Sequence, residues 1–226
     1  EIAQCLVGSE MCIRDSFMSN LVYFLGQKAY INITNACTNA CRFCVRDIKD
    51  DVVGANLWLD VQNVKAEDVI EQIKDSARKI LEGGEIIFCG YGEPLIKFEE
   101  VKKICQYLRK EMPGLKIRIN TNGHGSFVNK KNIAPELKGL VDTISISLNA
   151  QDEKLYNELS RPKFEGAYAA MLDFARECVK CGIDTTMSVV SKFEEDKYPL
   201  DIEKCEEIAH SIGANFRNRE WIKEGY

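Results

Sequence analysis

Two different spacings of apolar residues alternate along the chain from Tyr30 to Trp221. Runs in which every second residue is apolar predict β-strands, and longer runs with apolar residues three and four positions apart predict helices. Regular alternation of the two favours parallel strands joined by right-handed crossovers, an α/β fold. The predicted strands cover 30–34, 85–89, 115–121, 141–149, 184–190 and 214–221, and the predicted helices cover 69–81, 98–108, 133–139, 151–160, 166–181 and 200–211.

The strands have one polar face as well as one apolar face. Arg118 and Asn120 alternate with isoleucines in the third strand, and Thr143, Ser145 and Ser147 do so in the fourth. Strands of a parallel sheet covered by helices on both sides are instead apolar nearly throughout. A barrel lumen that holds a polar ligand explains the pattern. Because a complete barrel takes about 250 residues, six strands predict an open (β/α)6 partial TIM-type barrel in a single domain.

The first residues follow neither period. The string CLVGSEMCIRDS within them looks like translated sequencing-adapter DNA. We therefore expect residues 1–17 to be a non-native, adapter-derived leader, and residues 18–226 to form the core domain. Setting aside Cys5 and Cys12 leaves eight of the ten cysteines to be explained.

Composition and charge disfavour several classes of function. The net charge is −5, from 30 basic and 35 acidic residues without a basic block, which disfavours binding to nucleic acid. No stretch approaches the roughly 20 apolar residues of a membrane-spanning helix. Ten cysteines without a secretory signal pattern favour reduced thiols and a cytoplasmic location.

Three cysteines directly follow the first predicted strand. Cys37, Cys41 and Cys44 have the spacing C-x3-C-x2-C, at the strand end where parallel α/β folds place their active sites. Structural zinc normally takes four ligands. Three thiolates in one loop suit a [4Fe–4S] cluster with one iron that has no protein ligand. The plainer alternative is three buried thiols without a metal.

A second motif, Gly90-Tyr91-Gly92-Glu93-Pro94, ends the second predicted strand. Its glycines allow the backbone to approach a ligand closely. Together the two motifs resemble those of the radical S-adenosylmethionine (SAM) superfamily. That resemblance implies an enzyme in which the methionine part of SAM completes the cluster. Reduction of the cluster then cleaves SAM to a 5′-deoxyadenosyl radical, which abstracts hydrogen from a substrate.

The resemblance also implies cofactor contacts. The cluster ligands are Cys37, Cys41 and Cys44, and the Gly92–Glu93 region accepts from the ammonium group of SAM. The other expected cofactor contacts are Phe43 on the adenine, Gly90, Pro94, Asn120, Asn122, Ser147 and Asn149. Alternatively, these polar residues satisfy one another in the barrel. No catalytic residue is assigned.

A narrower resemblance links segments such as FCGYGEPL and RINTNG to the TatD-associated radical SAM proteins. It implies a functional link to a TatD-type hydrolase and a reducing partner such as flavodoxin or ferredoxin. The substrate, a small molecule or a macromolecule, stays open. Two rivals are a non-enzymatic iron–sulfur or zinc module for electron transfer, and a barrel lyase or aldolase with incidental cysteines.

Several other residues have an ordinary explanation. Cys178 and Cys181 form a C-x-x-C near a predicted helix end, and we expect surface or core thiols there rather than a redox site. His124, in the loop after the third strand, is expected on a loop surface rather than in contact with substrate. Arg118, Arg217, Arg219 and Glu220 are expected on the lumen face, either in an internal ion-pair network or gripping a carboxylate or phosphate of the substrate.

Overall fold

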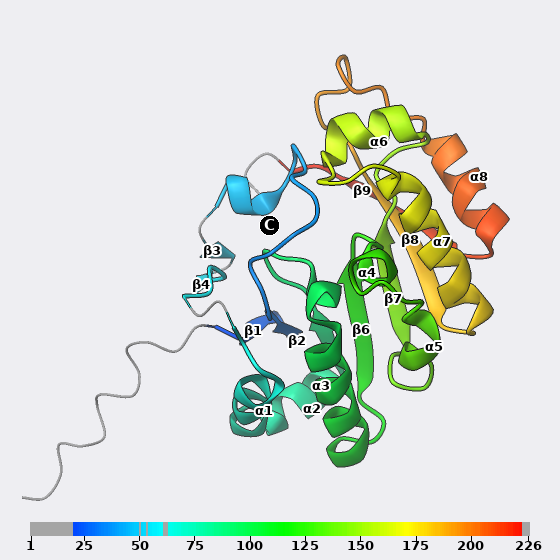
Figure 1. Ribbon diagram of the computed structural model, residues 1–226. Coiled ribbons are helices and arrows are strands. Elements are labelled where there is room, and N and C mark those ends of the chain that lie inside the picture. The colour runs from blue at the N-terminus through cyan, green and yellow to red at the C-terminus, as the bar shows by residue number, and fades with distance from the viewer. Residues whose placement is uncertain (1–19, 50, 53, 61–62, 223–226) are drawn as a thin grey trace, which may run out of the picture.

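A computed structural model describes residues 20–49, 51–52, 54–60 and 63–222, and the expected leader 1–17 lies outside them. One seven-stranded sheet organises these residues, in the order β1-β2-β5-β6-β7-β8-β9 (Figure 1). All neighbours pair in parallel except β1, which is antiparallel to β2. The predicted α/β fold with a mostly parallel sheet is therefore confirmed, and it fits a partial TIM-type barrel.

The elements follow one another as the alternation of periods predicted. The sheet strands are β1 (Val22–Leu25), β2 (Lys28–Ile31), β5 (Glu85–Phe88), β6 (Lys116–Thr121), β7 (Thr143–Ser147), β8 (Asp184–Ser191) and β9 (Asn215–Glu220), and a small ribbon holds β3 (Asp51–Val52) and β4 (Ala55–Asn56). The α-helices are α1 (Ala66–Asp75), α2 (Ala77–Gly83), α3 (Phe98–Glu111), α4 (Gly125–Val128), α5 (Ala134–Leu137), α6 (Glu153–Ser160), α7 (Ala167–Lys180) and α8 (Ile202–Ile212). Two short 3-10 helices, η1 (Val45–Asp47) and η2 (Pro94–Lys97), complete the set.

The apolar face of the sheet packs against helices, and this contact forms the main core. Ile86, Ile117, Ile144 and Met187 come from four adjacent strands and are essentially fully buried. Helices α3, α7 and α8 bring their own apolar residues to this core and lie along one face of the sheet (Figure 1). The alternate residues of the same strands are mostly polar, with Ile87 and Val190 as apolar exceptions, and they face the lumen, as the period of two requires.

Several details differ from the predicted elements, and the β3–β4 ribbon, α4 and the two 3-10 helices were not predicted. Strand β1 was not predicted, although the turn Gly26-Gln27, with Gly26 at φ 60°, is a two-residue hairpin signal. The helix predicted over 69–81 is two helices, because Ser76 leaves the helical region at ψ 9°. No helix follows β9 within the described residues, so the count of six β/α units is not confirmed.

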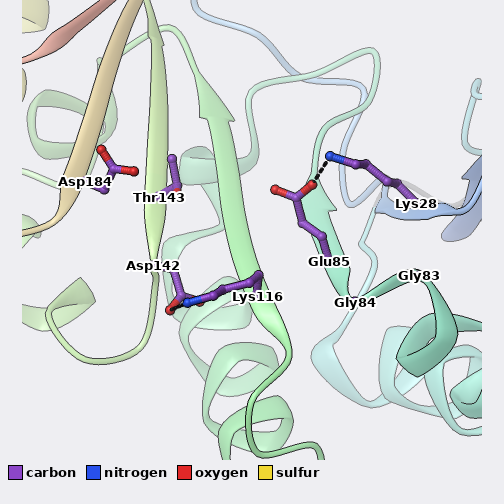
Figure 2. A pocket seen from close by; sticks show the side chains of 8 residues that line it. All are labelled: Lys28, Gly83, Gly84, Glu85, Lys116, Asp142, Thr143 and Asp184. Atoms are coloured by element: carbon purple, nitrogen blue, oxygen red, sulfur yellow. Dashed lines mark hydrogen bonds and ion pairs between the residues drawn. The ribbon is translucent and has the colours of Figure 1, made fainter.

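A cavity lies at the N-terminal ends of the strands, at the opposite end of the sheet from the cysteine loop. It has a volume of about 580 Å³. The charged groups Lys28, Glu85, Lys116 and Asp184 line it and come from four different strands (Figure 2). We call this end of the sheet the mouth. Among the described residues, no helix is both long and apolar enough to cross a membrane.

Candidate functional site

The three cysteines lie in the loop after β2. Burial raises the pKa of all three thiols, that of Cys41 to about 12. The nearby Cys37 and Cys44 thiols contribute to the shift of Cys41. Thiolates in this environment need a compensating positive charge, which bound iron provides. The donor set therefore fits an iron–sulfur cluster.

The arrangement of the thiols differs from that of a single-ion site. Within the described ranges, no three Cys, His, Asp or Glu side chains converge as the ligands of one ion do. In an iron–sulfur cluster, each cysteine binds a different iron atom, so the sulfurs need not converge on one point.

Backbone hydrogen bonds fasten the cysteine loop to the end of α6. The Arg42 amide donates to the Leu159 carbonyl at 2.9 Å, and the Ala40 amide donates to the Ser160 carbonyl at 3.1 Å. The Ser160 side chain also hydrogen-bonds the Cys41 thiol. The loop is therefore held by an element more than 100 residues away in sequence.

The carboxylate of Glu93 joins the Gly-rich motif to the end of β6. Its oxygens accept from the Thr121 hydroxyl at 2.7 Å, the Asn122 amide at 2.7 Å and the Leu95 amide at 3.0 Å. Burial raises its pKa to about 7 despite these donors. The Glu93 amide donates to the Ala36 carbonyl, next to Cys37, at 2.8 Å. Glu93 thus joins β6, the motif and the cysteine loop, and its carboxylate already has three protein donors.

The two glycines of the motif are required by close backbone packing. A Cβ at Gly92 would overlap the carbonyl oxygens of Thr34 and Ala36, and a Cβ at Gly90 would overlap the Asn32 side chain. Between them, the Tyr91 hydroxyl donates to the Lys49 carbonyl at 2.6 Å. The motif is therefore pressed against the start of the cysteine loop.

His124 is buried and central, which corrects the expectation of a loop-surface position. Its Nδ1 lies 2.9 Å from the Thr38 hydroxyl and its Nε2 lies 3.0 Å from the Tyr156 hydroxyl. The Thr38 hydroxyl also accepts from Asn122 at 2.7 Å. The ring is fully buried, and burial lowers its pKa to about 4. A neutral imidazole therefore connects the cysteine loop to α6.

Sequence reasoning did not find the partners of His124. Thr38 lies inside the C-x3-C spacing, and Asn39 beside it donates to the Tyr156 hydroxyl at 3.3 Å. Tyr156 is on α6, and nothing in its local pattern sets it apart from an ordinary core aromatic residue. One feature of the sequence could have indicated a role for His124, namely its position directly after Asn122 and Gly123.

The other expected cofactor contacts lie near the same end of the sheet, but they do not all contact one another. Asn122 donates to the Cys37 sulfur at 3.7 Å, and Pro94 starts η2 beside Glu93. Asn149, at φ 62°, donates to the Ser160 hydroxyl at 3.0 Å. Phe43 packs edge-on against Phe193 instead, with ring centroids 5.7 Å apart. The remaining two sit on lumen positions of their strands, Asn120 on β6 and Ser147 on β7.

The charged residues expected on the lumen face separate into two groups. Arg118 pairs with Glu85 at 3.4 Å, and Arg217 donates to the Ser145 hydroxyl at 3.5 Å. Glu220 points elsewhere: it is exposed and pairs with Lys192 at 2.5 Å. The expectation for Glu220 was wrong, because it is one residue out of phase with Arg217 and Arg219.

The C-x-x-C pair lies at the end of α7. Cys178 is buried in the core, and Cys181 is the partly exposed C-cap residue of that helix. These positions agree with structural thiols.

Comparisons with known proteins agree with this geometry. The family model for the Radical SAM superfamily matches residues 31–205. A curated relative is the probable dual-specificity RNA methyltransferase RlmN of Carboxydothermus hydrogenoformans, which is 28% identical over 168 residues. The match covers 69% of this chain and 43% of the relative. The chain thus spans less than half the length of that relative.

Solved structures share the fold at low sequence identity. Streptococcus suis SuiB bound to the precursor peptide SuiA gives a TM-score of 0.63 at 17% identity, over 86% of this chain and 39% of SuiB. A radical SAM methyltransferase from Sphaerobacter thermophilus gives 0.54 at 18% identity, over 88% of this chain and 68% of that one. The family match covers well over half of the chain and includes all three cysteines. The chain belongs to the Radical SAM superfamily, whose enzymes use a [4Fe–4S] cluster and S-adenosylmethionine.

Proposed function

We propose that this chain binds a [4Fe–4S] cluster through Cys37, Cys41 and Cys44 and binds SAM along the adjacent strand ends. When bound and reduced, the cluster supplies the electron that cleaves SAM to a 5′-deoxyadenosyl radical, which abstracts hydrogen from a substrate. The observation that carries the proposal is the three-cysteine loop, fastened by Glu93 and His124 over the carboxyl ends of the strands.

The protein groups contribute positioning. Because the Glu93 carboxylate is used by Thr121, Asn122 and Leu95, we assign it the role of holding the motif rather than that of a free acceptor. Backbone carbonyls around Gly90–Gly92 are then the acceptors for the SAM ammonium group. Asn120, Asn122, Ser147 and Asn149 supply polar groups along the same edge, and Phe43 supplies an aromatic face.

The test is 5′-deoxyadenosine formation by protein that starts at Met18. The protein is reconstituted anaerobically with iron and sulfide and then supplied with SAM and dithionite. We expect product from the parent protein and none from Cys41→Ala. The matched control is Cys181→Ala, which removes a thiol at the end of α7 and keeps parental product formation.

Each other outcome decides between the alternatives. An intact cluster, seen by its absorbance, without any product supports the electron-transfer module. Failure to assemble a cluster, or product formation by Cys41→Ala equal to that of the parent, refutes the assignment of the cysteines.

For the partners, we propose a reducing protein such as flavodoxin or ferredoxin, a functional link to a TatD-type hydrolase and a cytoplasmic setting with reduced thiols. The TatD link is supported by the sequence segments named above. RNA methylation belongs to the name of the curated relatives. We do not extend it to this chain, because the chain matches less than half of those relatives and carries a net charge of −5.

A further inference from the structure

Two N–H groups donate hydrogen bonds to the sulfur of Cys37. One is the backbone amide of Asn39, at 3.4 Å, and the other is the side-chain NH2 group of Asn122, at 3.7 Å. The first donor belongs to the cysteine loop itself, whereas Asn122 directly follows β6 and lies 85 residues further along the chain. The second donor is therefore supplied by the tertiary structure, and a substitution can remove it without altering the sequence of the loop.

The neighbours of Asn122 fix the orientation of its amide group. Its Oδ1 accepts from the backbone N–H of His124 at 3.1 Å, and its Nδ2 donates to the Thr38 hydroxyl oxygen at 2.7 Å. Because a backbone N–H can only donate, the amide oxygen faces His124 and the NH2 group faces Thr38 and Cys37. The NH2 group has two hydrogens, so it can serve both acceptors at once.

The remaining contacts close a ring of hydrogen bonds that starts and ends at Cys37. The Thr38 hydroxyl lies 2.9 Å from Nδ1 of His124, and the Tyr156 hydroxyl lies 3.0 Å from its Nε2. The Tyr156 hydroxyl also accepts from the side chain of Asn39 at 3.3 Å. A neutral imidazole has one donor and one acceptor nitrogen, so it can pair with both hydroxyls in either tautomer. His124 thereby holds the hydroxyl to which the NH2 group next to the sulfur is bound.

Most of this ring is shielded from solvent. His124 and Tyr156 have no exposed surface, and Asn39 and Asn122 are only 2% and 8% exposed. Water therefore cannot replace a partner that is removed, and a hydrogen bond is electrostatically stronger in such surroundings than in water. Hydrogen bonds to the cysteine sulfurs are among the factors that set the reduction potential of an iron–sulfur cluster.

We propose that Asn122 raises the reduction potential of the cluster by donating to the Cys37 sulfur, and that His124, acting through Thr38, is the positioning residue for this donor. The proposal rests on the proposed function, because it requires the cluster at Cys37. Reduction adds one electron, which comes from the reductant, and no bond forms or breaks. An N–H group directed at a ligand sulfur stabilises the added negative charge, so its removal makes reduction harder.

The experiment measures the midpoint potential of the cluster in the reconstituted protein. The protein is titrated anaerobically with dithionite in the presence of redox mediators, and the EPR signal of the reduced cluster is followed. No SAM is present, so lost contacts with the cofactor do not affect the result. We expect Asn122→Ala to lower the ratio of reduced to oxidised cluster about tenfold at a fixed potential, which is about 59 mV for one electron.

Thr38→Val removes the one oxygen that Asn122 and His124 share and keeps the shape of the side chain. It should lower the same ratio several-fold, and Thr38→Ser, which keeps the hydroxyl, should restore the parental potential. The matched control is Thr185→Val. The buried Thr185 hydroxyl donates to the Ile183 carbonyl near the N-terminal end of β8, and its removal should leave the potential unchanged.

A double variant tests the order of the residues in the ring. His124→Phe removes both ring nitrogens and should lower the potential in the same direction as Thr38→Val. Because His124 acts through Thr38, the double variant should shift the potential no further than the larger single shift. Shifts that add would overturn the role assigned to His124.

The iron content of every variant is measured beside its potential. Parental potentials in Asn122→Ala and Thr38→Val at parental iron content would overturn the proposal, as would equal shifts in Thr38→Val and Thr38→Ser. If Asn122→Ala does not hold the cluster, the two Thr38 variants decide. Unshifted potentials in variants that still form 5′-deoxyadenosine would refute this inference alone. Shifted potentials without 5′-deoxyadenosine from the parent would refute the cleavage of SAM and leave this inference intact.

Discussion

The two ends of the parallel strands differ in the partners that their polar groups have. At the carboxyl end, Glu93 and His124 are buried and each holds several partners from distant elements. At the mouth, Lys28 and Glu85 pair across a cavity, with the lysine side chain 51% exposed. Water can replace a partner at the mouth but not at the buried end. The candidate site is therefore the end with the costly polar network, although the cavity of about 580 Å³ is at the other end.

The largest expected difference between the two ends is in cluster loading, and it comes from substituting one glycine at each end. Gly92→Ala would press a Cβ against the Thr34 carbonyl, and Gly83→Ala would press one against the Gln27 carbonyl near the mouth. Both should destabilise the fold, each by at least about 2 kcal/mol, because the backbone must move. Only Gly92→Ala should also lose the cluster, since Thr34 leads into the cysteine loop. Iron content and urea unfolding measure the two effects, and equal cluster loading in both variants would contradict the comparison.

A smaller difference, in unfolding free energy, is expected between the substitutions of two glutamates. Glu93→Gln removes a carboxylate oxygen that accepts from buried donors, and the loss should be about 2–3 kcal/mol of unfolding free energy. Glu85→Gln at the mouth should cost less, because its pair with Lys28 is half in solvent, although its pair with Arg118 is mostly buried. Denaturant unfolding of both variants checks the ranking, which a larger loss for Glu85→Gln would reverse.

The pH dependence of stability isolates His124. Its pKa of about 4 in the fold lies below the ordinary value of 6.5. The unfolded chain therefore binds a proton that the folded chain does not, and stability is lost as pH falls from about 6.5 toward 4. The loss between pH 7.5 and 5 should be about 2 kcal/mol.

His124→Gln should remove that loss. Glu93 titrates near the same range with the opposite sign, since its raised pKa favours the fold at lower pH. The readout is therefore the difference between parent and variant unfolding free energies at the two pH values. A difference that does not change with pH would show that His124 is not held neutral.

The smallest effect is expected for Lys28→Gln at the mouth. Its ion pair with Glu85 is half in solvent, so the variant should lose no more than about 0.5 kcal/mol and keep full cluster loading. Thermal unfolding at two salt concentrations checks this, because the small contribution of an exposed pair fades with salt. A loss as large as that of Glu93→Gln would remove the distinction between the two ends.

The sequence by itself determined the order of the elements and the nature of the cysteine loop. The period of two in segments such as 116–121 and 143–147 set the strands and their polar face, because side chains alternate across a strand. The spacing of Cys37, Cys41 and Cys44, together with Gly90–Pro94, carried the family resemblance, which the family match bears out.

Only the tertiary structure decided how these parts are held together. It placed Tyr156 and Ser160 of α6 against the cysteine loop and buried His124 between Thr38 and Tyr156. It also placed Arg118 of β6 in an ion pair with Glu85 of β5 at 3.4 Å. Contacts between residues tens of positions apart depend on the path of the chain, and a local pattern of apolar and polar residues records only which face of its own element each residue occupies.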